Sequence, residues 1–238
     1  MKTTNILAAA VALLVSVSAS AQTVDEIVDK HVAALGGADK LKGVNTLIIE
    51  RSLSVQGMEI PTIMTVVVGK SLRSESTIMG NAMVQVLDGS TGWSIKPAMM
   101  GGTGEPEDMT AVELKQMTGQ LDPFGALMNY KEKGNKVDLV GKEKVDGKDA
   151  YHLKVTTKDG TAIDEYLDAT TYMVSKVKAN MNGQDGEIMF SDYKDVDGIK
   201  FASTMEMQNP QAGQLTFVTT KTQINPKIDE SVFKKPAK

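Results

Sequence analysis

The sequence predicts a mainly β fold in which a long antiparallel sheet curls toward a barrel, with an N-terminal helix and a helical insertion. Three observations support this fold class. Apolar and polar residues alternate along most of the chain from about residue 46. Tight-turn signals separate the alternating stretches, and the alternation breaks only over residues 98–133. Because about ten strands or more follow one another, the sheet cannot stay flat and has to twist and curl.

The first 21 residues have the pattern of a secretory signal peptide. Lys2 supplies a positive start, an uncharged apolar run extends over residues 6–19, and Ala19-Ser20-Ala21 matches a cleavage site. The run is shorter than the roughly 20 residues that cross a bilayer. We therefore predict cleavage after Ala21, export of the mature protein, and a single domain over residues 22–238.

The composition excludes several classes of function. The 238 residues include no cysteine, which excludes disulfides, thiolate metal sites and cysteine nucleophiles. The formal net charge is −4 and the charges are mixed along the chain, so nucleic acid is not an expected partner. Methionine is abundant, with 15 residues against 5 Phe, 5 Tyr and 1 Trp. Its flexible side chain either fills a core or lines a surface for varied apolar ligands.

After the signal, the first expected element is an amphipathic helix over residues 23–35. Its apolar side chains recur at three- and four-residue spacings, and Gly36-Gly37 is a typical C-terminal stop. His31 lies on or near the apolar stripe of this helix, where a packed neutral ring is expected more often than a ligand.

From about residue 46 the period of the apolar residues changes to two, which is typical of β-strands. The apolar residues on one face of the first strand are Leu47, Ile49, Leu53 and Val55. The alternating stretches before the insertion cover about residues 46–55, 58–68, 71–79, 82–88 and 92–96. A turn at Gln56-Gly57 joins the first two of them.

Residues 98–133 interrupt the strands and contain two expected short helices. The first is marked by Met109, Val112 and Met117 and ends near Gly119. The second begins at Asp122-Pro123, an N-cap followed by proline at the first helical position. Its apolar side is formed by Phe124, Leu127 and Met128. A helical insertion between strands is either a functional lid or a plug, and the sequence leaves both open.

Strands resume after residue 134 and continue to about residue 223, separated by Asp-Gly pairs. Both central residues of a type I′ turn need positive φ, which glycine takes freely and aspartate tolerates. The pairs begin at Asp88, Asp146, Asp159, Asp185 and Asp197. The similar stretches "KVDGKDAYHLKV" and "DVDGIKFASTMEM" have different flanks. They therefore indicate one type of turn used twice, not a duplicated module.

Large apolar residues occupy many interior positions of the predicted sheet. Examples are Met64, Trp93, Met181, Met205 and Phe217. Either such side chains fill the inside of the curled sheet, or the sheet encloses an apolar cavity that the helical segment covers. The pattern alone leaves both arrangements open.

The sequence contains no recognisable catalytic or metal-binding motif. Its two histidines, His31 and His152, lie far apart, in a predicted helix and a predicted strand. An acid–base pair within residues 164–168 is a weak alternative. A soft Cu(I) site of Met99, Met100 and Met109 is also weak, because no His or Cys is near. We therefore predict no metal, no cofactor and no enzyme activity.

Three stretches resemble the periplasmic lipoprotein carriers of the LolA and LolB type. "VLDGSTGWSIKP", residues 86–97, is similar to a strand–turn–strand stretch of that superfamily. "EYLDATTYMVSKVKANMNGQDGEIMFSDYKDVDGIKF", residues 165–201, is similar to its later hairpins. "ALGGADKLKGVNTL" resembles the N-termini of LolA-like proteins assigned to lipoprotein sorting. The order of the three stretches extends the resemblance over nearly all of the mature chain.

The resemblance implies an unclosed antiparallel β-barrel with a helical lid at about residues 98–133. It also implies a monomeric periplasmic carrier whose apolar hollow takes up lipoprotein acyl chains or other lipids, in the sorting of outer-membrane lipoproteins. Burial of an acyl chain gains about 0.8 kcal/mol per CH₂. The candidate ligand-binding residues are Leu53, Ile60, Met64, Val66, Met83, Trp93, Ile95, Met99, Met109, Met117, Phe124, Leu127, Met128, Met181, Met205 and Phe217.

The sequence departs from the family at the contact that holds the lid. In LolA-type carriers an arginine helps to latch the lid, whereas "VVGKSLRSE" has Lys70 at that place and Arg73 three residues later. We expect Lys70 and Arg73 to contact the lid, although lysine cannot form the planar, multiply bonded contact of arginine. The alternative function is a lipid-sensing or protein-interaction module of an envelope stress or assembly pathway.

Overall fold

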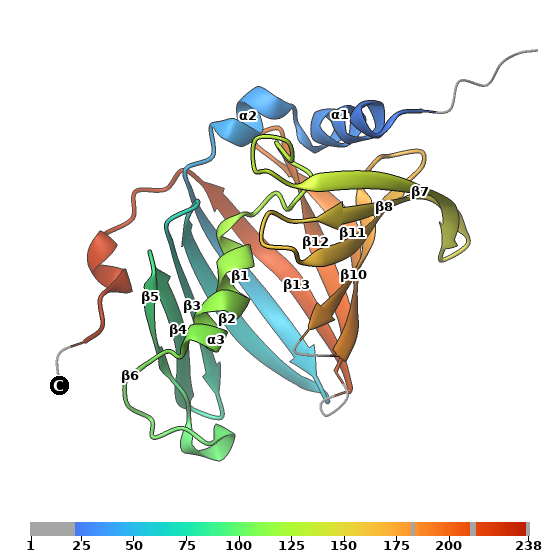
Figure 1. The fold of residues 1–238 in the computed structure, drawn as a ribbon. Coiled ribbons are helices and arrows are strands. Elements are labelled where there is room, and N and C mark those ends of the chain that lie inside the picture. The colour runs from blue at the N-terminus through green and yellow to red at the C-terminus, as the bar shows by residue number, and fades with distance from the viewer. Residues whose placement is uncertain (1–21, 182–183, 210–212, 237–238) are drawn as a thin grey trace, which may run out of the picture.

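The computed structural model describes residues 22–181, 184–209 and 213–236. The expected signal peptide, residues 1–21, lies outside the described residues. The described chain forms one long, strongly curled sheet, with two helices lying across one end and a third inside the curve (Figure 1).

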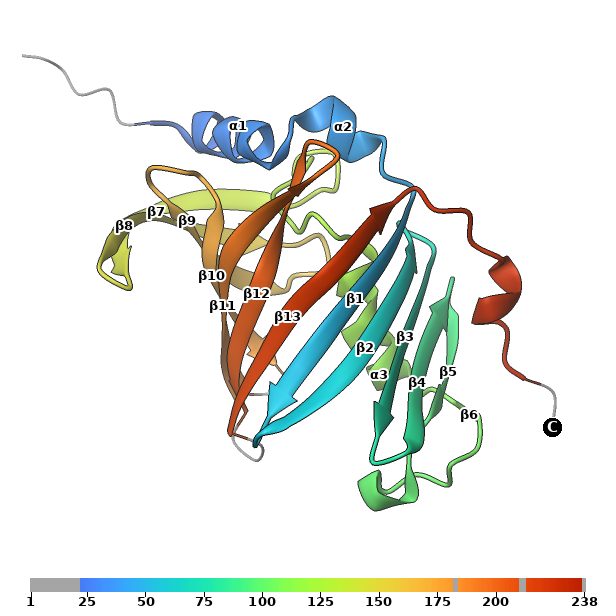
Figure 2. The same ribbon diagram turned by 180° about the vertical axis from the view of Figure 1, so that it is seen from behind.

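The sheet contains 13 strands among the described residues, and every pairing found is antiparallel. The strands are β1 Thr46–Val55, β2 Met58–Val67, β3 Ser71–Ile78, β4 Asn81–Asp88, β5 Thr91–Ile95, β6 Glu107–Asp108, β7 Lys136–Val145, β8 Lys148–Thr156, β9 Ala162–Asp168, β10 Val174–Met181, β11 Gln184–Val196, β12 Ile199–Asn209 and β13 Gly213–Ile224. Their spatial order is β6-β5-β4-β3-β2-β1-β13-β12-β11-β10-β9-β8-β7. The sheet therefore has two edges, β6 and β7, and is not closed. The predicted fold class, an unclosed antiparallel β-barrel, is confirmed (Figures 1 and 2).

The N-terminal helix forms where the apolar periodicity predicts it. α1 spans Val24–Leu35 and begins with a capping box, in which Thr23 and Glu26 satisfy each other's backbone N–H groups. Gly36 ends the helix at φ 135°, and a Cβ at this position would lie 2.4 Å from the carbonyl oxygen of Gly198. A short second helix, α2 Ala38–Lys42, follows directly.

The predicted tight turns form at some of the Asp-Gly pairs. Asp146-Gly147 and Asp197-Gly198 have positive φ at both residues, as a type I′ turn requires, and so does Gln56-Gly57. Asp185 instead lies inside β11, paired with Asn180. The expected turn at Asp185 is therefore wrong, because the ladder between β10 and β11 continues as far as Met181 and Gln184.

Only one of the two expected helices forms in the insertion. α3 spans Ala111–Thr118, and two single 3₁₀ turns flank the region: η1 Ala98–Met100 and η2 Gly119–Leu121. The second expected helix is wrong, because the residues after Asp122 form consecutive turns. Gly125 and Asn129 have φ of 74° and 54°, and left-handed residues at this spacing break the ladder of a right-handed helix.

The hydrophobic core covers both faces of the sheet. On the concave face, α1 packs through Ile27 and Val28 against β8 and β9, while α3 and η2 pack against β1–β4. On the convex face, the C-terminal segment with η3 Glu230–Phe233 packs against β3–β5 (Figure 2). In the described parts of the chain, no helix is long and apolar enough to cross a membrane.

Candidate ligand-binding face

The concave face of the sheet divides into a closed part and an open part. The closed part lies under the helical segments, and its side chains are almost fully buried: Leu47, Ile49, Val66, Leu72 and Leu87. The open part lies toward the Gln56-Gly57 turn, and its side chains are only partly buried: Leu53, Met83, Met205, Met207, Leu215 and Phe217. None of these six belongs to the buried clusters or packs against them. The concave face therefore keeps six apolar side chains that are only partly buried and lie outside the buried clusters.

Strand pairing puts five of the six members of the open part side by side. Leu53 is paired with Phe217, and Phe217 with Met205, so that β1, β13 and β12 contribute one apolar row. Leu215 is paired with Met207 in the next row. On the other side of Leu53, Ile60 of β2 is buried and continues the row. These rows form a continuous apolar strip across neighbouring strands.

A polar row crosses the concave face between the closed and open parts. Strand pairing aligns Ser76, Thr62, Arg51 and Thr219 in this row, and Met83 of the open part borders it as the partner of Ser76 on β4. Arg51 lies between Ile49 of the closed part and Leu53 of the open part, because residues i−2 and i+2 share a face of a strand. Its Nε atom is buried and has no hydrogen-bond partner in the described part of the chain, and burial lowers the pKa of the guanidinium.

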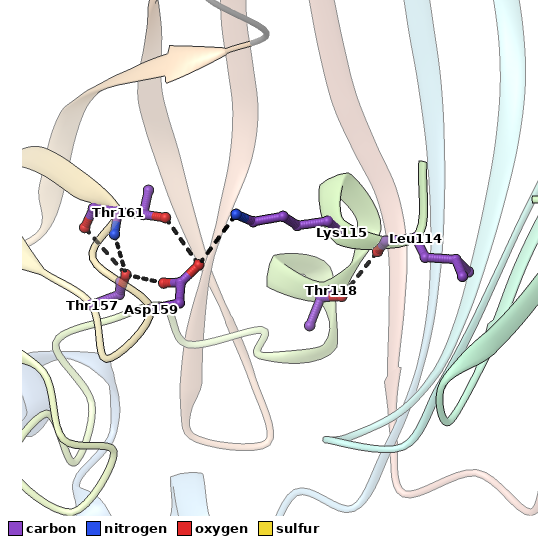
Figure 3. A network of polar contacts seen from close by, with 6 residues as sticks. All are labelled: Leu114, Lys115, Thr118, Thr157, Asp159 and Thr161. Carbon is purple, nitrogen blue, oxygen red and sulfur yellow. Dashed lines mark hydrogen bonds and ion pairs between the residues drawn. The ribbon is translucent and has the colours of Figure 1, made fainter. Parts of the chain in front are cut away.

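The insertion crosses the open side of the sheet for a topological reason. It leaves the sheet at one edge, β6, and returns at the other edge, β7. α3 therefore lies inside the curve, in front of the strands in Figure 1 and behind them in Figure 2. At its far side, Lys115 of α3 reaches toward Asp159 in the loop between β8 and β9, with 3.9 Å between Nζ and Oδ2 (Figure 3).

α3 is held against β5 by a close approach and an ion pair. A Cβ added at Gly92 would lie 2.5 Å from the Val86 carbonyl oxygen and 2.7 Å from Cδ2 of Leu114. Only glycine leaves room for α3 at this point. Glu113 forms an ion pair with Lys96, and its carboxylate also accepts a hydrogen bond from the Thr110 N–H at the start of α3. These contacts lower the pKa of the Glu113 carboxyl to about 2, and the contact with Lys96 is the largest cause.

The structure does not bring all of the predicted ligand-binding residues together. The open part and its row contain Leu53, Ile60, Met83, Met205 and Phe217. The buried clusters under the helical segments contain or contact Met64, Val66, Met109, Met117, Phe124, Leu127 and Met128. Met99 is exposed in η1. The side chain of Met181 lies outside the described part of the structure.

Trp93 and Ile95 lie on the convex face, contrary to their expected place inside the barrel. They are paired with Val86 and Val84, whose side chains point away from the concave Leu87. Trp93 donates a hydrogen bond from Nε1 to the Phe233 carbonyl oxygen at 2.9 Å. The alternation in β5 is confirmed, but the expected face of Trp93 and Ile95 is wrong. The C-terminal segment packs on the convex face and buries apolar side chains there as well.

Lys70 and Arg73 also hold the C-terminal segment, and the expected contact of their side chains with the lid is not found among the described residues. Lys70 pairs with Glu230 at 2.8 Å, and Arg73 donates to the Val232 carbonyl oxygen at 3.0 Å. The link to the insertion at this turn is made by the backbone, where the Gly69 N–H donates to the Leu121 carbonyl oxygen at 3.0 Å.

Sequence reasoning missed Arg51 on the concave face, and it considered Glu165 only as a member of a weak acid–base pair. Arg51 falls in the same alternating set as Ile49 and Leu53, so the periodicity alone could have identified it. Glu165 is 6% exposed in β9. Its burial, with the nearby charge of Asp122, raises the pKa of its carboxyl to about 7, although Lys133 acts in the opposite direction.

Other polar features lie away from this face. A hollow of about 430 Å³ between the convex face and the C-terminal segment is lined by charges of both signs, including Arg73, Glu75 and Lys227. His152 lies between Glu143 and Asp164 on the outer side of β7–β9, and the buried His31 ring bonds to the Tyr172 carbonyl oxygen at 2.8 Å. The described residues contain no cluster of three or more His, Asp or Glu side chains that could hold a metal.

These features define a protein with the LolA-like fold. An outer membrane lipoprotein-sorting protein domain from Vibrio parahaemolyticus is 18% identical, with a TM-score of 0.54 over 88% of this chain and 95% of that one. A LolA superfamily protein from Nitrosomonas europaea is 13% identical, with a TM-score of 0.58 over 90% and 99%. A DUF1329 family protein from Desulfovibrio piger is 17% identical, with a TM-score of 0.55 over 89% and 97%.

At the level of sequence, the chain belongs to a family described as "Uncharacterized protein", whose pattern matches residues 114–237, more than half of the chain. No curated protein matches the sequence. The solved structures establish the fold, and the chemistry of the concave face has to supply the function.

Proposed function

We propose that this protein binds the acyl chain of a lipid or lipoprotein on the open part of its concave face and carries it through the periplasm. The observation that supports the proposal best is the strip of half-buried apolar side chains that lie outside the buried clusters of the described chain. Large exposed apolar patches on a water-facing protein mark ligand or partner sites. A curled strip walled by strands fits an extended chain better than it fits a globular partner.

The chemistry of the strip suits a flexible apolar ligand. Met83, Met205 and Met207 contribute unbranched, polarisable side chains that adapt to different chain shapes. Each CH₂ group removed from water gains about 0.8 kcal/mol. A chain of sixteen carbons that buries about half of its surface would therefore gain on the order of 6 kcal/mol before the costs of ordering.

We also propose that the protein is exported, forms one domain and acts by binding. Residues 1–21 would direct export and be removed, and residues 22–238 would act as one domain, a monomer with α3 as a lid over the face. Binding, and not catalysis, is the proposed activity, because the concave face offers apolar contacts and no acid–base or nucleophilic pair among its described residues. Handling of outer-membrane lipoproteins is the proposed setting.

A probe-binding experiment with two neighbouring variants tests the proposal. Phe217 points to the concave face and Val218, the next residue in β13, points to the convex face, where it is 39% exposed. The mature protein, Phe217→Asp and Val218→Asp are titrated with a fluorescent fatty acid. We expect Phe217→Asp to weaken binding at least tenfold and Val218→Asp to change it less than twofold.

Extraction of lipid provides the second half of the test. Native mass spectrometry of protein purified from its host should reveal bound lipid that is lost in Phe217→Asp. The proposal fails if the mature protein carries no lipid and takes up no acyl probe. A stoichiometric protein partner recovered without lipid would instead favour the interaction module.

A further inference from the structure

Arg51 is a cation on an apolar face without any counter-charge in the described structure. Its Nε is buried and unbonded, and no hydrogen bond or ion pair of its guanidinium is found among the described residues. The acidic residues nearest in β1 and β2, Glu50 and Glu59, belong to the opposite face, since they alternate with Arg51 and its pairing partner Thr62.

A partly buried guanidinium whose Nε has no partner among the described residues is unfavourable for the folded protein on its own. Removing a charge from water without a partner costs free energy, and buried arginines are almost always paired. A leucine or methionine at position 51 would pack between Ile49 and Leu53 without that cost. Retention of the charge is accounted for if an anion occupies the position when the protein is loaded.

The row that contains Arg51 has hydroxyl side chains that suit a polar group. Its partners across the strands are Thr62 on β2 and Thr219 on β13, and Ser76 extends the row on β3. These three side chains carry hydroxyl groups that can donate to an anion. The polar row is bordered by the closed part on one side and by the apolar strip of the open part on the other.

We propose that Arg51 binds the anionic head group of a single-chain amphiphile whose tail lies along the open part. The head group is a carboxylate or a phosphate, which a guanidinium binds through two parallel N–H···O bonds. This inference rests on the proposed function and adds to it the chemical class of the ligand and its direction. Between Arg51 and Val55 the strand advances about 13 Å, so the first part of the tail lies beside Leu53 and Phe217.

The other charged residues near the concave face are consistent with a head group at Arg51 and a tail along the open part. Lys70 and Arg73 are engaged with the C-terminal segment on the convex face, so Arg51 is the guanidinium available to the strip. The buried Glu165 lies on β9, on the part of the concave face that α1 and the insertion cover. Arg51 attracts an anionic head group, whereas the Glu165 carboxyl offers it no positive charge.

Paired ligands that differ only in the head group test the inference. Binding of laurate, dodecyl phosphate and dodecanol is measured by displacement of a neutral fluorescent acyl probe from the mature protein at fixed ionic strength. The variants are Arg51→Met, Arg51→Lys and Lys221→Met. Lys221 is a matched control, because it lies on β13 but pairs with Glu50 on the convex face.

We expect the unmodified protein and Lys221→Met to bind laurate or dodecyl phosphate at least tenfold more tightly than dodecanol. In Arg51→Met this preference should fall to less than twofold while dodecanol binding is kept, which also shows that the variant is folded. Arg51→Lys should retain part of the preference. Acetate and inorganic phosphate should not displace the probe, because the tail supplies the apolar contacts.

The outcomes separate the inference from the proposed function. If all three ligands bind with equal affinity, or if Arg51→Met keeps the preference, the head-group site is overturned and the acyl-binding function stands. Displacement by inorganic phosphate or acetate at the same concentrations would identify a site for free anions and overturn the lipid assignment. If none of the acyl ligands and no probe binds, the proposed function itself fails.

Discussion

The buried carboxyl of Glu165 makes the stability of the protein depend on pH, and Glu165→Gln tests this dependence. Glu165 is 6% exposed on β9, and burial and Asp122 raise the pKa of its carboxyl from 4.5 to about 7. Burial dominates because removing a carboxylate from water penalises the charged form. Glutamine has nearly the same shape and stays neutral at every pH.

The sign and size of the effect follow from proton linkage. Between pH 4.5 and 7 the folded state holds a proton on Glu165 that the unfolded state has released, so the free energy of unfolding falls as pH rises. The contribution of the protonated form is fully present below pH 4.5 and is lost as pH rises through about 7. A difference of about 2.5 pKa units corresponds to roughly 3 kcal/mol at pH 8.

Urea unfolding at a series of pH values measures this contribution. We expect Glu165→Gln to match the unmodified protein near pH 4 and to be more stable by about 3 kcal/mol at pH 8. Glu132→Gln, the same substitution at an exposed residue, should show no such divergence. A difference between Glu165→Gln and the unmodified protein that stays constant over this range would refute the reasoning.

Three further predictions concern the helix α3. Gly92→Ala should destabilise the protein by about 1–3 kcal/mol, as measured by urea unfolding, because its Cβ overlaps the backbone and α3. Gly119→Ala is the control and should be tolerated, because a Cβ there meets nothing within 4 Å and the φ of −61° is helical. Thr110→Ala removes the α3 cap at a cost of about 1 kcal/mol, and hydrogen exchange should quicken in α3 without a change in β1; equal quickening in both would contradict a local role. Lys115→Met should leave the midpoint of urea unfolding unchanged, because its ion pair with Asp159 is long and exposed; a clear drop would give that contact a larger role.

Local patterns predicted the fold well, because the alternation of apolar and polar residues in each strand can be recognised from that stretch of sequence alone. The stop of α1 at Gly36, the turn at Asp197-Gly198 and the break over the insertion depend on residues that are neighbours in the chain. The second expected helix failed because Gly125 and Asn129 adopt left-handed conformations, which the favourable start at Asp122-Pro123 does not reveal.

The faces of the sheet were harder to predict than its strands. Alternation separates the two faces of a strand but does not indicate which face is concave. The large apolar side chain of Trp93 therefore predicts a place inside the barrel, whereas Trp93 packs against Phe233 on the convex face. The C-terminal segment that decides this lies far away in the chain. Arg51 was identifiable from the alternation of β1, but its lack of a partner depends on the neighbouring strands and becomes visible only in the structure.

The methionine methyl groups provide the most direct test of the central claim, that an acyl chain lies on the open part of the concave face. The mature protein is labelled with ¹³C at its methionine methyls, and a fatty acid with a nitroxide on its tail is added. We predict strong broadening of Met83 and Met205, and unchanged signals for Met189, which packs on the convex face, and for Met79, which is 69% exposed at a turn. Equal broadening of Met189 and Met205, or broadening of none, would contradict the account.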